Sequence, residues 1–197
     1  MVPPVQPALI NTDSFPVVST PPVTETNLNP HQLVAELTGL KPDATQNAIT
    51  REQAERFKQN MAQLIQQGAA SVPAIQEFLT NNVDSAYDAV PGGDQLGYSS
   101  LRAGLLDALR QIGGPEAQGA MVQAIQTTAV PGEILELAKN LEQQAPGQYS
   151  DQIVNAAREA LEMSSQNKLG TNMEVGPVFR VIQSYSDPNP RALQDSN

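Results

Sequence analysis

Three aspartates in one loop are the first group in this sequence that could carry chemistry. Asp84, Asp88 and Asp94 lie in residues 81–98, where Pro91-Gly92-Gly93 breaks any periodic pattern. Carboxylate oxygens are the ligands that calcium prefers, but this spacing does not match that of an EF-hand loop. A hydrated loop is the more typical interpretation of such charges. The sequence therefore predicts no metal ligand here and leaves calcium binding open as an alternative.

The same loop contains two tyrosines, Tyr87 and Tyr98, which together with the aspartates make it a candidate contact surface. Loops between successive helices gather on one rim of a helical stack, and exposed loops often carry binding residues. We predict that this loop contacts a protein or peptide partner through Asp84, Tyr87, Asp88, Asp94 and Tyr98.

Residues for catalysis are scarce. The chain has no cysteine, which excludes disulfides, thiolate metal sites and cysteine nucleophiles, and His31 is its one imidazole. It contains no P-loop, dinucleotide-binding or nucleophile-elbow motif. Glu133, Glu136 and Glu142 share one predicted helix, where they are interpreted as a solvated face. The sequence therefore predicts no catalytic residue, no cofactor and no enzyme activity, with a carboxylate- or metal-dependent hydrolase as a remote alternative.

The excess of acidic over basic residues limits the kinds of molecule that this chain is expected to bind. Lys and Arg number 11 against 21 Asp and Glu, which gives a formal net charge of -10. A field of that sign repels phosphate backbones and argues against a nucleic-acid partner. The chain has no run of eighteen apolar residues, so no membrane span is predicted.

Proline divides the chain into regions. Of its 16 prolines, eight lie in the first 42 residues. Proline fixes φ and removes a backbone donor, so an extended arm is expected where it is dense. Asn29 and Pro30 then suit the start of a short helix. The predicted regions are a proline-rich extended arm (1–27), a short docking helix and linker (28–49), a helical repeat domain (50–187) and a frayed tail (188–197).

Helical periodicity dominates from Thr50 onward. Thr50 and Gln53 match a capping box, and apolar residues then recur at three- and four-residue steps. Glycine and proline interrupt this pattern at Gly113-Gly114 and again at Pro146-Gly147. Strand-like alternation is absent, so the predicted fold class is all-α. Residues 173–185 are expected to form a last helix, with a strand as the lesser alternative.

Three similar passages indicate a repeat. Each ends one helix and is followed closely by a second, and their separations are 45 and 32 residues. The longer separation contains the 81–98 loop. The passages are Leu64-Ile65-Gln66-Gln67-Gly68, Leu109-Arg110-Gln111-Ile112-Gly113 and Leu141-Glu142-Gln143-Gln144-Ala145. Glutamines near these helix ends suit contact with a protein partner, although glutamine is also simply a good surface helix former.

One segment carries a resemblance to a known family. Ser100-Leu101-Arg102, Leu105, Ala108-Leu109 and the run from Ile112 to Ala117 form a leucine/alanine helix that ends in Gly-Gly-Pro-Glu-Ala. This resembles HEAT-like (armadillo-type) α-solenoid repeats of the bacterial style, over roughly 50–187. The resemblance implies an α-α superhelix of about three to four antiparallel helix pairs. It also implies a concave face that holds protein partners.

The favoured function is a non-enzymatic protein- or peptide-binding scaffold module. The alternative is a cell-envelope structural protein, with the arm as a spacer to a removed export signal or anchor. The Met-Val-Pro-Pro start is similar to a chain trimmed after export. A periplasmic or secreted location is therefore slightly favoured over the cytoplasm. The sequence identifies neither the partner nor the oligomeric state.

Overall fold

Eight α-helices make up the domain in the residues that the structure describes. The computed structural model describes residues 28–43, 47–81, 84–128, 130–165 and 175–186. Two isolated β-bridges occur in these residues, but no β-strand. The all-α prediction is confirmed. The elements are α1 (Pro30–Thr38), α2 (Arg51–Gln66), α3 (Val72–Thr80), α4 (Leu101–Ile112), α5 (Gly114–Thr127), α6 (Pro131–Gln144), α7 (Ser150–Ser165) and α8 (Gly176–Ser186), with short 3₁₀ helices η1 (Gly68–Ser71) and η2 (Gly93–Leu96).

Side-chain caps fix where the first helices begin. At α1, the Asn29 side chain accepts from the Gln32 backbone N–H at 2.9 Å, and the Gln32 side chain accepts in return from that of Asn29. Thr50 and Gln53 form the same reciprocal pair at α2, as predicted. Ser100 caps α4. Each cap satisfies backbone N–H groups that the first helical turn leaves without partners.

Two consecutive glycines turn the chain between α4 and α5. Gly113 and Gly114 have φ of 63° and 79°, a region that residues with a Cβ adopt only at a steric cost. The chain reverses there without an intervening loop, and α5 begins at Gly114 with Pro115 in its first turn. The predicted helix break at this dipeptide is confirmed.

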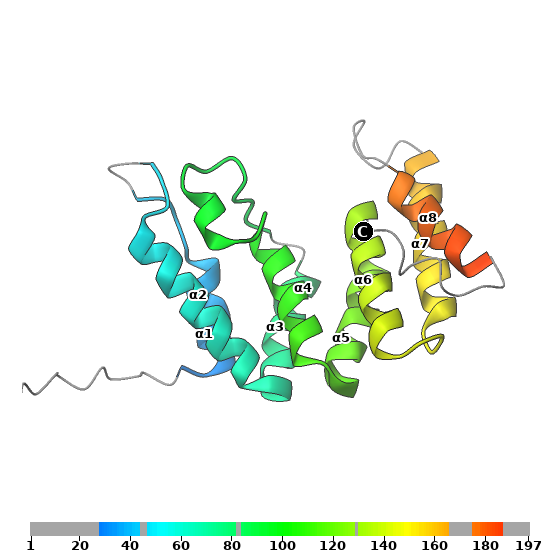
Figure 1. Cartoon of the computed structure of the whole chain (residues 1–197), viewed down its shortest axis with the longest axis horizontal. Helices are drawn as coiled ribbons and strands as arrows, with labels where there is room; N and C mark the ends of the chain where they lie inside the picture. The colour runs from blue at the N-terminus through cyan, green and yellow to red at the C-terminus, as the bar shows by residue number, and fades with distance from the viewer. Residues whose placement is uncertain (1–27, 44–46, 82–83, 129, 166–174, 187–197) are drawn as a thin grey trace, which may run out of the picture.

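The helix pairs follow one another in chain order. Figure 1 shows α1 and α2 at one end of the long axis and α7 and α8 at the other. Corresponding helices of successive pairs pack together, α2 on α4, α3 on α5 and α5 on α7. The last helix, α8, packs on both α6 and α7. The predicted helix at 173–185 is thus confirmed over 176–186, and the rest of a predicted fourth pair lies outside the described residues.

Leucine and alanine layers form the core between these helices. Leu64, Leu105, Leu109 and Leu137 are each 0 % exposed. Small side chains on α5 and α7 let neighbouring helices approach closely. The buried alanines of these two helices are Ala117, Ala120, Ala124, Ala156, Ala157 and Ala160.

A buried ion pair connects α4 to α6. Arg102 Nε donates to both carboxylate oxygens of Glu133, at 2.8 and 3.0 Å, and only 6 % of the Arg102 side chain is exposed. Arg102 Nη1 donates to the Leu79 carbonyl at the end of α3. The Thr128 hydroxyl donates to Glu133 at 2.6 Å. Glu133 was predicted to lie on a solvated face. That prediction is wrong, because the guanidinium of Arg102 holds its carboxylate between the two helices.

Removing one partner of this pair tests its contribution to stability. Glu133→Ala leaves the Arg102 charge buried without its carboxylate and is expected to lower the free energy of unfolding by about 3–5 kcal/mol. Urea denaturation followed by circular dichroism measures the loss. Glu55→Ala is the matched control, because it removes the exposed Arg51–Glu55 pair and is expected to cost about 0.5 kcal/mol or less. Equal losses in the two variants would contradict a structural role for the buried pair.

Candidate functional site

The predicted contact loop folds onto α2. Leu96 of η2 is 1 % exposed, and the Ile49 N–H donates to the Pro91 carbonyl at 2.8 Å. Gly93 is buried so closely that a Cβ there would collide with the backbone carbonyl of Tyr87. The sequence predicted a long hydrated loop. The correction is that Leu96 and Tyr87 anchor this segment in the apolar core, and Gly93 is the residue that permits the close approach.

Tyr87 is a core residue. Its side chain is 4 % exposed, and its ring meets that of Phe57 edge to face, with centroids 5.8 Å apart. Its hydroxyl is buried and has no hydrogen-bond partner among the described residues. Burial and the nearby Asp84 charge raise the pKa of Tyr87 to about 12. Tyr87 is placed to pack against Phe57 and is not on the surface where a partner would contact it.

Tyr98 joins the loop to α4. Its hydroxyl donates to Asp107 Oδ2 at 2.9 Å, and its ring lies 6.4 Å from that of Phe57. Burial, followed by the Asp107 hydrogen bond, raises the pKa of Tyr98 to about 12. Burial disfavours ionisation of Asp107, but hydrogen bonds from Arg110, Tyr98 and Gln111 outweigh it and hold the pKa of that carboxyl below its usual value. Tyr98 therefore positions the loop.

The three aspartates of the loop are exposed, but they differ in their hydrogen bonds. Asp84 Oδ1 accepts from the Arg102 backbone N–H at 3.0 Å and so stabilises the start of α4. Asp88 and Asp94 are free to meet solvent. Within the described part of the chain, no three side chains of suitable type gather to hold a metal ion. The predicted partner contact through this loop stays a prediction, and its exposed residues are Asp84, Asp88 and Asp94.

The other residues that could carry chemistry are dispersed. His31 Nε2 lies 3.4 Å from Glu77 Oε2 on the surface of α1 and α3. Glu142 was predicted to be solvated but accepts a hydrogen bond from the Tyr185 hydroxyl at 3.0 Å. Burial and the Glu142 charge raise the pKa of Tyr185. Glu142 thus ties α6 to α8, which the sequence did not predict. Glu136 remains exposed, as predicted.

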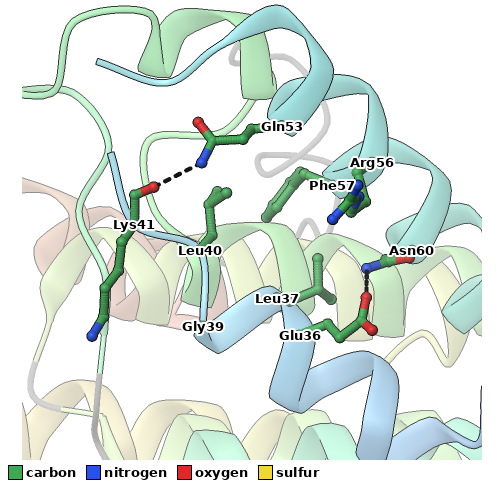
Figure 2. A pocket seen from close by; sticks show the side chains of 9 residues that line it. All are labelled: Glu36, Leu37, Gly39, Leu40, Lys41, Gln53, Arg56, Phe57 and Asn60. Carbon is green, nitrogen blue, oxygen red and sulfur yellow. Dashed lines mark hydrogen bonds between the residues drawn. The ribbon is translucent and has the colours of Figure 1, made fainter. Parts of the chain in front are cut away.

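A pocket of about 450 Å³ lies between α1, the segment that follows it, and α2. Figure 2 shows Leu37, Leu40 and Phe57 pointing toward one another between the two helices. Leu37 and Phe57 are almost fully buried and Leu40 is half-buried, so these three form the apolar floor. The remaining lining residues are Glu36, Gly39, Lys41, Gln53, Arg56 and Asn60.

Hydrogen bonds hold the rim of this pocket in place. Asn60 Nδ2 donates to Glu36 Oε2 at 2.9 Å, which ties α2 to α1 (Figure 2). Gln53 Nε2 donates to the Lys41 carbonyl at 2.9 Å, while its Oε1 accepts from Thr50 at the helix start. One glutamine thereby caps α2 and fixes the segment that closes the pocket. The rim is thus held by hydrogen bonds between groups of the protein itself.

The lining of the pocket suits binding of an extended segment. The apolar floor can accept an apolar side chain of a ligand. Around it lie the amides of Gln53 and Asn60. The charged residues of the rim are Glu36, Lys41 and Arg56. Sequence reasoning missed this site, although one signal was present. Asn60 stands among Ala54, Phe57, Met61 and Leu64 on the buried side of α2, where a polar residue needs a partner.

Comparison with family models, curated proteins and solved structures finds no match to this chain. None of the described helices has the length and hydrophobicity needed to cross a lipid bilayer.

The two loop tyrosines are expected to respond differently to loss of the hydroxyl. Tyr98→Phe removes a hydrogen bond to a carboxylate and is expected to destabilise the domain by about 1–2 kcal/mol. Tyr87→Phe removes a buried hydroxyl without a partner and is expected to leave stability unchanged or raise it by about 1 kcal/mol. Thermal melts of both variants measure this. Equal destabilisation by the two changes would contradict the assigned environments.

Alkaline titration tests the same two phenols. Folding favours the neutral form of each, so the stability they contribute is complete below the unfolded pKa of 10.0 and is lost as the pH rises toward about 12. The free energy of unfolding of the natural chain is therefore expected to fall over that interval. Tyr87→Phe should make the decline shallower. Urea denaturation at several pH values measures the slope, and an unchanged slope in the variant would contradict the buried phenol at Tyr87.

Proposed function

We propose that this chain is a non-enzymatic protein- or peptide-binding scaffold module whose contact site is the pocket between α1 and α2. The observation that carries the proposal is the combination of an apolar floor with a rim that is already fixed by hydrogen bonds. A preformed rim lowers the ordering cost that a flexible site meets on binding.

The lining defines what the partner segment offers. An aliphatic or aromatic side chain would lie chiefly on Leu40, the half-buried residue of the floor, where it removes apolar surface from water. Arg56 is exposed at the edge and would meet a carboxylate or a backbone carbonyl of the same segment. The proposed ligand is therefore an extended peptide segment with one apolar anchor and an adjacent acceptor group.

We further propose that the helix pairs form a HEAT-like α-solenoid. The packing of α2 on α4, of α3 on α5 and of α5 on α7 supports this, because corresponding helices of successive pairs stack in such repeats. The exposed Asp88 and Asp94 of the 81–98 loop are proposed as a separate contact region. No specific observation in the described residues favours the hydrolase or the cell-envelope alternative.

A peptide display screen on the immobilised full-length chain tests the function. Random peptides with an apolar residue beside an acceptor-rich position are expected to be enriched. Arg56→Glu reverses the charge at the rim, and Leu40→Ala removes part of the floor. Each is expected to weaken the selected peptides by about tenfold, which corresponds to about 1.4 kcal/mol. Fluorescence anisotropy with labelled peptides measures the affinities.

A charge-matched variant away from the pocket provides the control. Arg158 is exposed on α7, so Arg158→Glu makes the same change in net charge at a distant site and is expected to leave affinity unchanged. Circular dichroism melts establish that all variants fold. The proposal is overturned if no peptide is enriched, or if Arg56→Glu and Leu40→Ala bind the selected peptides as tightly as the natural chain.

A further inference from the structure

A second opening lies between α4 and α6. This groove has a volume of about 390 Å³ and is independent of the α1–α2 pocket. It exists because α4 and α6 pack less closely against each other than α2 and α4 do. Its walls are Ala103, Leu106 and Asp107 of α4, Gly132, Glu133, Glu136 and Asn140 of α6, and Gly97, Tyr98 and Ser99 of the loop.

Two of the three carboxylates in the groove already have cationic partners. Glu133 is paired with the buried Arg102 guanidinium. Asp107 accepts from Arg110 Nη2 at 2.6 Å, as well as from Tyr98 and Gln111. Glu136 has no hydrogen bond or ion pair within the described ranges, and its side chain is exposed. Glu136 is therefore the carboxylate of the groove that is free to accept a hydrogen bond from a ligand.

Asn140 supplies an independent observation at the same place. Five polar or charged residues are buried in the described part of the chain, and four of them use their side chains in hydrogen bonds. The exception is Asn140, which is 5 % exposed, lines the groove and has no side-chain partner among the described residues. The polar atoms of this amide are not sealed from solvent, so they are open to the groove and can bond to a ligand there without breaking a bond to the protein.

The spacing of Glu136 and Asn140 places both groups on one wall. They are four residues apart on α6, so their side chains leave the helix on the same face. A carboxylate oxygen and an amide oxygen side by side match the planar, multiply donating fork of a guanidinium. The aliphatic stem of an arginine would lie over Leu106 and Ala103 on the opposite wall.

We infer that the groove between α4 and α6 binds the guanidinium of an arginine side chain from a protein partner, with Glu136 and Asn140 as its acceptors. The formal net charge of -10 favours a cationic partner over an anionic one. The occupant is thus distinct from the apolar anchor proposed for the α1–α2 pocket. Binding in the groove can succeed or fail whatever the pocket binds.

Nuclear magnetic resonance titration of the ¹⁵N-labelled full chain tests the inference. The probe is the capped tripeptide Ac-Ala-Arg-Ala-NH₂, and its citrulline counterpart is the matched neutral control. The arginine peptide is expected to shift the Asn140 side-chain amide and the backbone amides of Ser99, Ala103 and Gly132, with a Kd of about 1–10 mM for a single side chain. The citrulline peptide is expected to bind at least about threefold more weakly, the size of a partly exposed ion pair.

Variants assign the two acceptors. Glu136→Gln and Asn140→Leu are each expected to weaken the arginine peptide by about threefold or more. Glu159→Gln makes the same charge change as Glu136→Gln at an exposed position on α7 and should have no effect. Absence of shifts at about 20 mM peptide would overturn the inference. Equal binding of the citrulline peptide, or full binding by Glu136→Gln, would overturn the assignment of a guanidinium site.

Discussion

The Arg102–Glu133 pair is the interaction on which the middle of the molecule depends. Arg102 lies in the first turn of α4, where the positive end of the helix dipole disfavours a cation. Glu133 lies in the first turn of α6, where the same effect favours an anion. The helix dipole of α4 therefore disfavours the charge of Arg102, and the carboxylate of Glu133, from the start of α6, offsets that unfavourable energy. Asp84 adds a second carboxylate, which accepts the Arg102 backbone N–H. Ser100 caps the start of α4 locally, and the ion pair adds a long-range contact that we interpret as setting α4 and α6 in register.

This polar connection also accounts for the groove beside it. Apolar residues on the buried faces of α2 and α4 pack those helices together, whereas the Arg102–Glu133 ion pair joins α4 to α6. Small residues, Ala103 and Gly132, face the space that remains. The geometry that fixes the register thus leaves an opening lined by carboxylates and one amide. A groove of this kind follows from the way the two helices are joined and does not need a separate insertion.

The fold was largely predictable from local sequence signals, because caps and turns act over a few residues. Asn29, Thr50 and the Gly113-Gly114 turn placed helix boundaries, and the three- and four-residue apolar steps identified most of the buried faces. The burial of Tyr87 and Leu96 within the long loop was missed, because composition alone does not show that these residues pack against α2. Glu133 and Glu142 were placed in solvent for the same reason, since their partners Arg102 and Tyr185 are 31 and 43 residues away. The periodicity of a single helix shows which face is apolar, but it does not show which polar residues pair with distant parts of the chain.

Polar residues within apolar stripes were the signal that could have located both openings. Asn60 interrupts the buried stripe of α2 and lines the pocket, and Asn140 interrupts that of α6 and lines the groove. The two amides differ in whether they have a hydrogen-bond partner in the protein, and this difference determines which interaction contributes most to ligand binding at each opening. Asn60 is already bonded to Glu36, so a ligand in the pocket gains chiefly by covering the apolar floor. Asn140 has no partner in the described residues, so a ligand in the groove gains chiefly from new hydrogen bonds and charge pairing.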